Sequence, residues 1–178
     1  MHREKTFSIE ICGLHRTLGI KDAGGDGKHP SLPLCGDVTL TNVSAGALAT
    51  KMAHLSWDLL AGPAPESIPL MQVLSTFLGR EYYLPLHRRL TSSMRDPLIV
   101  SDSHSSLWVL DGRRAEDVRG RDVMLITDVI TSDDTLRGAR TLIERAEGRV
   151  TGCAAILVSP PIARRRDHFF LAEIPSIG

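Results

Sequence analysis

A strand-like apolar run that leads into an acidic residue and a hydroxyl-rich loop restricts the possible folds more than any other segment. The run Val123–Asp128 predicts a buried strand, and Thr135–Glu147 predicts a helix after it. A second apolar run, Arg149–Val158, predicts another strand. Consecutive parallel strands need a crossover connection, usually a helix. The order strand, helix, strand therefore predicts an α/β fold with a parallel sheet.

The upstream half of the chain repeats this alternation of strands and helices. We expect helices at Ala45–His54 and Ile68–Leu78, and strands at Trp57–Ala61 and Tyr82–Leu86. The polar, serine-rich stretch 90–106 predicts a long excursion with a hairpin whose second arm is Leu107–Leu110. A length of 178 residues with 42% hydrophobic side chains suits one globular domain.

Charge and cysteine content argue against several classes of protein. The 21 Lys and Arg balance 21 Asp and Glu, so the chain lacks the global positive charge that sequence-independent nucleic-acid binding needs. No apolar run approaches the roughly 18 residues of a membrane span, and the N-terminus has no apolar signal core, so we expect a cytoplasmic protein. The cysteines Cys12, Cys35 and Cys153 lack disulfide-framework or zinc-site spacing, and we expect them to be small buried residues.

The loop after the strand Val123–Asp128 has two interpretations. Thr131, Ser132 and Thr135 carry hydroxyls, and the first N–H groups of the following helix lie beside them. Such a loop, at the carboxyl end of a parallel strand, can cradle a phosphate. Alternatively, Thr131, Ser132 or Asp133 simply caps the helix, as in an ordinary turn. The residues by themselves leave both interpretations open.

Segments along nearly the whole chain are similar to one enzyme family. The stretch 123–139 resembles the phosphoribosyl-pyrophosphate motif of type I phosphoribosyltransferases, which has four apolar residues, two acids, two apolar residues and a hydroxyl-rich loop. Other segments resemble a small adenine or purine phosphoribosyltransferase-like branch of that family: Gly13–Leu18, Gly36–Val38, Ile68–Leu70, Ser93–Pro97, Leu107–Gly112, His168–Leu171 and Glu173–Pro175.

The resemblance implies one domain over residues 1–178, with a mainly parallel sheet flanked by helices. Its core would span 43–159 with a flexible lid loop at about 88–106, and segments 1–42 and 160–178 would form a small hood. The resemblance also implies Mg²⁺, a phosphoribosyl-pyrophosphate donor, and displacement of pyrophosphate by a purine-type base. It implies a homodimer that takes a small-molecule nucleotide, nucleoside or sugar-phosphate ligand.

The resemblance also assigns expected roles to individual residues. Asp128 would hydrogen-bond a ribose hydroxyl, residues 131–135 would bind the 5′-phosphate, and Pro63–Ser67 would form the pyrophosphate loop. Together with the acid-base chemistry that carboxylates and a histidine can perform, these roles give Asp128, Glu66, Asp133 and His87 as the expected catalytic residues. The expected substrate-binding residues are Thr131, Ser132, Asp134, Thr135, Ser67, Arg88, Ile130 and Phe169.

The chain departs from the pattern of this branch at both phosphate sites. Thr127 stands in place of the first acid of the motif, and Asp133 stands in place of its glycine. In the pyrophosphate loop, Glu66 replaces a lysine and Ser67 a glycine. Like charges about 4 Å apart repel by about 4 kcal/mol at an effective dielectric constant of 20. The departures therefore predict weakened binding of the donor phosphates, unless Asp133 turns outward.

Two other functions are compatible with these departures. Glu66, Asp128 and Asp133 could converge with His87 and His104 in an enzyme that performs lyase, isomerase or hydrolase chemistry on the same fold. The chain could also be a non-catalytic nucleotide sensor or partner subunit. The carboxylates lack diagnostic metal-ligand spacing, and for Asp134 a solvated helix start is the favoured interpretation.

Overall fold

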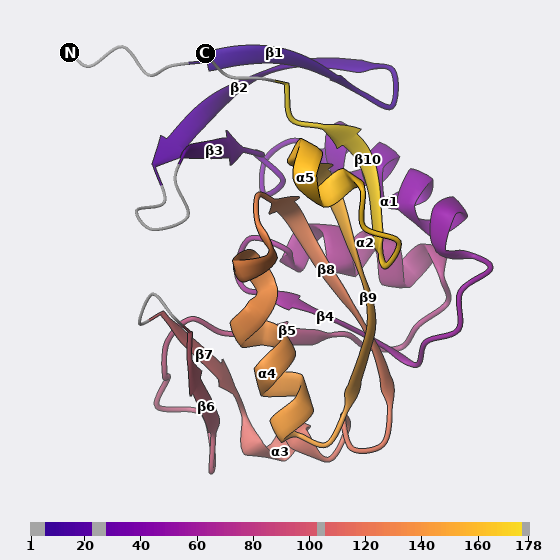
Figure 1. The fold of residues 1–178 in the computed structure, drawn as a ribbon. Helices are drawn as coiled ribbons and strands as arrows, with labels where there is room; N and C mark the ends of the chain where they lie inside the picture. Colours follow the sequence, from indigo (N-terminus) through magenta and orange to yellow (C-terminus); the bar gives the residue numbers. More distant parts are fainter. Residues whose placement is uncertain (1–5, 23–27, 103–105, 176–178) are drawn as a thin grey trace.

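A sheet of five parallel strands forms the centre of the molecule, and its strand order is β10-β9-β8-β4-β5 (Figure 1). The computed structural model describes residues 6–22, 28–102 and 106–175. The strands of this sheet are β4 Leu59–Pro63, β5 Leu84–Leu86, β8 Asp122–Ile130, β9 Arg149–Val158 and β10 His168–Glu173. The predicted α/β class with a parallel sheet is confirmed.

Helices cover both faces of this sheet (Figure 1). On β8, Met124 and Ile126 join one buried cluster with residues of α1 and α2, whereas Val123 and Leu125 join the other with residues of α4. Alternate side chains of one strand thus fill both cores, as expected for a parallel sheet that is buried on both faces. The helices are α1 Val38–Met52, α2 Ile68–Phe77 and α4 Arg137–Arg145, with the short α3 Gly112–Ala115 and α5 Pro160–Ala163 in connections.

A separate three-stranded antiparallel sheet precedes α1 and lies beyond β10 and α5 in Figure 1. Its strands are β1 Thr6–Ile11, β2 Leu14–Asp22 and β3 Lys28–Ser31. Cys12 and Gly13 join β1 to β2 with φ angles of 50° and 81°, the left-handed backbone that a two-residue hairpin turn needs. The sheet lies within the segment 1–42 that we expect to form part of a hood. The division of the chain at residues 42 and 160 stays a prediction.

The long segment between β5 and β8 contains the expected hairpin. Strands β6 Leu98–Ser101 and β7 Leu107–Leu110 pair antiparallel. Residues 103–105, which include His104, lie outside the described part of the chain. Closure of the stretch 88–106 as a lid stays a prediction.

The first helix begins earlier than the sequence predicted. α1 starts at Val38 rather than Ala45, because Asp37 caps it and accepts a hydrogen bond from the Leu40 N–H at 2.9 Å. The Arg16 guanidinium of β2 donates to the same carboxylate and holds the pKa of Asp37 below its usual range. This contact joins the N-terminal sheet to the core.

The other element boundaries follow the predictions more closely. The strand predicted at Arg149–Val158 has those bounds in the structure, and the helix predicted at Ile68–Leu78 ends one residue earlier. The expectation of three buried cysteines is wrong for Cys12 and Cys35, which are exposed in loops, and correct for Cys153. No helix within the described residues is long and apolar enough to cross a bilayer.

Gly62→Ala should destabilise the fold because β4 and β8 approach closely beside it. A Cβ at Gly62 would lie 2.2 Å from the backbone oxygen of Ile126, which no side-chain movement can relieve. We expect a loss of about 1–3 kcal/mol in the free energy of unfolding, measured by urea denaturation. Gly46→Ala is the control, because its Cβ would lie 3.8 Å from the Phe77 ring and it should stabilise α1 by about 0.5–1 kcal/mol. Equal stabilities of the two variants would contradict the close approach.

Candidate functional site

A cavity of about 730 Å³ lies where the carboxyl ends of β4 and β8 meet the segment that follows the N-terminal sheet. This size and position are typical of ligand sites in open α/β proteins. One wall is residues 29–36, a second comes from the end of β4, and a third from the end of β8 and its loop. The chemically active side chains on these walls are Lys21, His29, Cys35, Glu66, Arg88, Asp128, Thr131 and Thr135.

The carboxyl group of Asp128 is partly buried in the wall that β8 forms. Its Oδ1 accepts hydrogen bonds from the Val129 N–H at 2.8 Å and from the Thr127 hydroxyl at 3.2 Å. Burial raises the pKa of Asp128, and the negative charge of Glu66 raises it further. Asp128 is therefore more basic than an ordinary aspartate, which suits a group that accepts or holds a proton.

The hydroxyl-rich loop after β8 is ordered by its own side chains. Thr135 Oγ1 accepts a hydrogen bond from the Ser132 N–H at 3.2 Å, and it lies 3.2 Å from the Thr131 hydroxyl. The Ser159 hydroxyl donates to the Thr131 carbonyl at 2.6 Å. Residues Asp133–Leu136 form a 3-10 helix that leads into α4. Thr131 and Thr135 therefore both stabilise the start of the helix and line the cavity.

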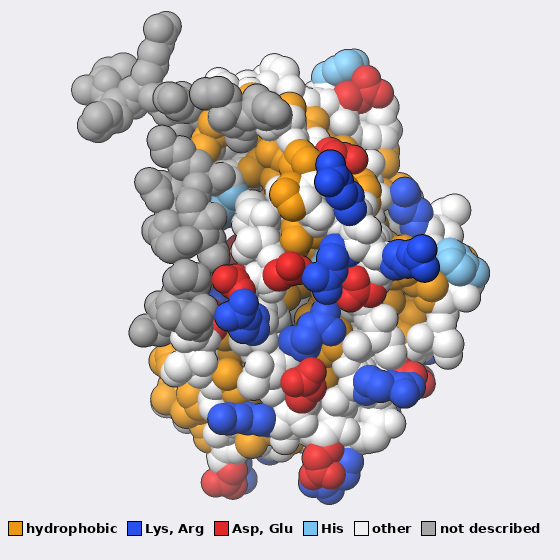
Figure 2. All heavy atoms as spheres, viewed as in Figure 1, with side chains coloured by type: hydrophobic (Ala, Val, Ile, Leu, Met, Phe, Trp, Pro, Cys, Tyr) orange, Lys and Arg blue, Asp and Glu red, His pale blue; other side chains and the backbone are white. Residues whose placement is uncertain are grey.

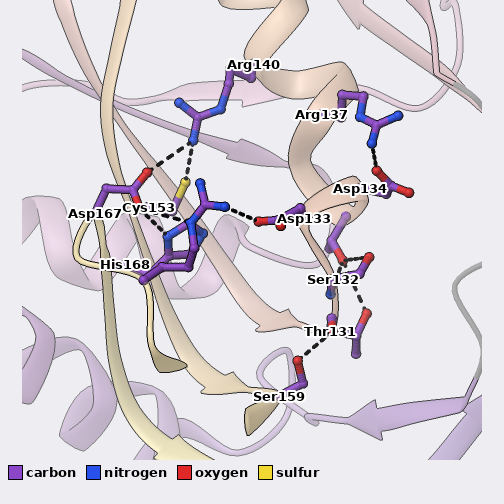
Figure 3. A network of polar contacts seen from close by, with 12 residues as sticks. Thr131, Ser132, Asp133, Asp134, Arg137, Arg140, Cys153, Ser159, Asp167 and His168 are labelled. Carbon is purple, nitrogen blue, oxygen red and sulfur yellow. Dashed lines mark hydrogen bonds and ion pairs between the residues drawn. The ribbon is translucent and has the colours of Figure 1, made fainter. Parts of the chain in front are cut away.

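The two acidic residues of this loop are held by arginines (Figure 3). The carboxylate of Asp133 pairs with the Arg165 guanidinium at 2.9 Å, and Asp134 pairs with Arg137. Arg165 precedes β10, so the pair joins the loop after β8 to the connection between β9 and β10. On the face drawn in Figure 2, acidic and basic side chains are interspersed. Neither Asp133 nor Asp134 contributes to the cavity wall.

Glu66 and Arg88 bring opposite charges to the cavity. Glu66 is exposed and lies in the turn between β4 and α2. The Arg88 guanidinium lies 3.4 Å from the centroid of the Trp108 ring on β7, a cation–π contact. Arg88 is also 3.9 Å from the carboxylate of Asp102, which accepts a hydrogen bond from the Trp108 indole at 3.2 Å. The hairpin β6–β7 thus helps to position a cavity arginine.

The structure therefore brings together only part of the expected site. Glu66, Arg88, Asp128, Thr131 and Thr135 share the cavity. The remaining expected residues do not line the cavity. Asp133 and Asp134 form ion pairs, and the Ser132 N–H holds the loop together. The backbone of His87 pairs with Val109, Ser67 and Ile130 are buried, and Phe169 is partly buried in β10.

Three cavity residues escaped the sequence analysis. Lys21, His29 and Cys35 lie in or beside the stretch 21–33, which is rich in glycine and proline and carries no recognisable motif. Their side chains have no spacing that indicates a site. The antiparallel pairing of β2 and β3 places Lys21 opposite His29, and Cys35 lies in the turn between β3 and α1. Among the described residues, no group of three His, Cys, Asp or Glu side chains could hold a metal ion.

Known proteins resemble this chain in both sequence and fold. The orotate phosphoribosyltransferase of Xanthomonas axonopodis pv. citri is 32% identical over 128 residues, which are 70% of this chain and 52% of that protein. The adenine phosphoribosyltransferase of Thermoanaerobacter pseudethanolicus superposes with a TM-score of 0.69 at 19% identity, over 83% of this chain and 88% of that one. The chain belongs to the type I phosphoribosyltransferase family.

Other comparisons refine this assignment. The Trypanosoma brucei adenine phosphoribosyltransferase in complex with AMP, pyrophosphate and ribose-5-phosphate has a TM-score of 0.60 at 12% identity, over 83% of this chain and 70% of that one. No family model matches this chain. The chain spans about half the length of the curated relatives it matches.

Asp128→Asn should stabilise the protein at neutral pH. Burial raises the pKa of Asp128, so ionisation opposes folding as the pH rises above the unfolded-state value of about 3.9 and through the folded-state value. Asparagine keeps the oxygen that accepts from Val129 and Thr127. Urea denaturation between pH 4 and pH 8 should show a gain on the order of 1 kcal/mol at pH 7 that closes toward pH 4.

Asp122→Asn is the control of opposite sign. The hydrogen bond from Arg149 lowers the pKa of Asp122, so its ionised form stabilises the fold above the unfolded-state pKa, and that stability is lost as the pH falls through the folded-state pKa. The asparagine variant should therefore be less stable than the parent protein at pH 7. A stability difference for Asp128→Asn that is the same at every pH would contradict its raised pKa.

Proposed function

We propose that this chain transfers a 5-phosphoribosyl group to or from a nucleobase. One observation carries the proposal: Asp128, Thr131 and Thr135 line the same cavity at the carboxyl end of β8. The carboxylate is a suitable acceptor for a ribose hydroxyl, and the hydroxyl-rich loop is suited to a phosphate three residues further along. The names of the sequence relatives and structural neighbours support the same reaction class.

The residues of the cavity have distinct proposed roles. The 5′-phosphate would accept hydrogen bonds from the hydroxyls of Thr131 and Thr135 and from N–H groups of the loop. Asp128 would orient the ribose, and Arg88 would supply positive charge toward the phosphates. Direct roles for Asp133, His87, Ser132, Asp134, Ser67, Ile130 and Phe169 stay predictions.

The proposed reaction exchanges two bonds at the anomeric carbon. A base nitrogen forms a bond to C1 of the ribose and releases its proton to water, while the C1–O bond to diphosphate breaks and its electron pair leaves with the diphosphate. The reverse reaction regenerates the free base. Asp128 would stabilise the positive charge that develops on the ribose ring.

Magnesium is part of this proposal because of the family resemblance. When bound, Mg²⁺ would neutralise charge on the diphosphate. Glu66 and Asp128 offer carboxylate oxygens, which Mg²⁺ takes together with substrate phosphate oxygens and water. The chain itself supplies two such side chains at the cavity. A homodimer and a cytoplasmic location also stay predictions.

Hydrolysis of a nucleotide is the second candidate function. The raised pKa of Asp128 beside Glu66 favours it, because two interacting carboxyl groups can divide the roles of acid and base. Water would attack C1, the bond to the base would break, and the base would take up the proton. Ribose 5-phosphate and free base would then form without any diphosphate. Nucleotide binding without turnover would instead indicate a non-catalytic sensor.

One assay distinguishes these functions and identifies the base. The protein is incubated with Mg²⁺, phosphoribosyl pyrophosphate and either adenine, the purine-type expectation, or orotate, named in the sequence relatives. We expect nucleotide and pyrophosphate in equal amounts, measured by chromatography. Thr135→Val should lower kcat/KM at least about tenfold, because a charge-assisted hydrogen bond is lost. Thr141→Val on α4 is the matched control. Absence of nucleotide with either base would contradict the transferase proposal.

Arg165→Ala should weaken phosphate binding by releasing the charge of Asp133. An exposed ion pair contributes about 0.2–1 kcal/mol, so we expect the affinity for ribose 5-phosphate to fall by up to about fivefold in calorimetry. The double variant Asp133→Asn with Arg165→Ala should recover the affinity, because the released charge is absent. Failure of this recovery would contradict the electrostatic explanation. Loss of turnover in Asp133→Asn alone would support the catalytic role expected from the sequence.

A further inference from the structure

Two carboxyl groups lie on adjoining walls of the cavity. Asp128 lies in the wall formed by β8, and Glu66 lies in the turn that follows β4. Strands β4 and β8 are neighbours in the sheet, and the two carboxyl groups are near enough for the charge of Glu66 to raise the pKa of Asp128. An anion beside Glu66 therefore meets the negative charge of that carboxylate, with the Asp128 carboxyl group nearby.

The phosphate-binding loop differs from this part of the cavity. Thr131 and Thr135 present hydroxyls, and the charge of Asp133 is held by Arg165 outside the cavity wall. Asp134 is likewise paired, with Arg137. One phosphate can thus bind at the loop with little repulsion from the loop's own acids.

We infer that Glu66 is a specificity-determining residue that selects a ribosyl monophosphate and disfavours a diphosphate at C1 of the same sugar. This inference rests on the proposed function, since it takes the loop after β8 as the site of the 5′-phosphate. A ribose whose 5′-phosphate lies at that loop and whose ring lies at Asp128 directs its C1 substituent toward another part of the cavity. Glu66 gives that part a charge that favours a neutral or cationic substituent, such as a nucleobase, over a diphosphate.

The distinction between Glu66 and Asp128 follows from their surroundings. Asp128 is held by two hydrogen bonds from its own strand, and burial favours its neutral form. Glu66 is exposed at the cavity mouth, where it can carry its full charge toward an entering ligand. Repulsion between this charge and a diphosphate within a few ångströms is enough to change affinity by at least about tenfold.

Calorimetry on Glu66→Lys and Glu66→Gln tests the inference. The probes are ribose 5-phosphate, AMP, orotidine 5′-monophosphate and pyrophosphate, all without metal, because Mg²⁺ held by Glu66 would mask the charge of its carboxylate. We expect Glu66→Lys to bind pyrophosphate at least about tenfold more tightly than the parent protein, with Glu66→Gln between them. Affinity for ribose 5-phosphate should stay within about twofold, because that phosphate lies at a separate loop. Glu144→Lys, the same charge change on the exposed surface of α4, should alter neither affinity.

The outcomes separate this inference from the function on which it rests. If the parent protein binds neither ribose 5-phosphate nor a nucleotide, the proposed function is wrong. If it binds them but Glu66→Lys leaves the affinity for pyrophosphate unchanged, only the inference is wrong. Equal gains for pyrophosphate and ribose 5-phosphate would also overturn it, because Glu66 would then act on anions in general. Thermal unfolding of each variant checks that the exposed substitution leaves the fold intact.

Discussion

The pairing of β8 with both β4 and β9 is the constraint on which the rest of the structure depends. β8 is buried on both faces, with Met124 and Ile126 in one core and Val123 and Leu125 in the other. A one-residue change of register would exchange these two sets of side chains. The same register sets where β8 ends, and therefore where Asp128 and the hydroxyl loop lie. Core packing and ligand geometry are thus coupled through one strand.

The central sheet could be predicted from the sequence because its signals are local. Apolar runs such as Arg149–Val158 are long enough to indicate strands on their own, and the intervening helical spacing indicates crossovers. The N-terminal sheet was not predicted, although Thr6–Ile11 alternates polar and apolar residues as a half-buried strand does. Its partner strands lie beside a segment rich in glycine and proline, which indicates a loop. The start of α1 depends on Asp37 and on an arginine of another strand, which is a tertiary contact.

In the candidate site, too, the residues placed by local sequence could be predicted, whereas those placed by tertiary contacts could not. Asp128, Thr131 and Thr135 follow directly from a strand and its loop, so their common location could be predicted. The ion pair of Asp133 could not be predicted, because its partner Arg165 lies 32 residues further along the chain and reaches the loop only through the β9–β10 connection. Lys21 and His29 come to the cavity through antiparallel pairing of strands that the sequence did not reveal, and Cys35 comes there in the turn that follows them.

The two unexpected acids show why charge partners matter more than charge content at such a site. Asp133 and Glu66 both seemed from the sequence to oppose phosphate binding, and the chain as a whole is neutral. In the fold, Asp133 pairs with an arginine outside the cavity, whereas Glu66 lies on the cavity wall and acts on Asp128. We therefore propose that the loop after β8 keeps its capacity for a phosphate while the turn after β4 opposes one. A fold can retain one anion site and change the neighbouring one because separate loops carry the two sites. The strands β4 and β8 that precede these loops keep their register.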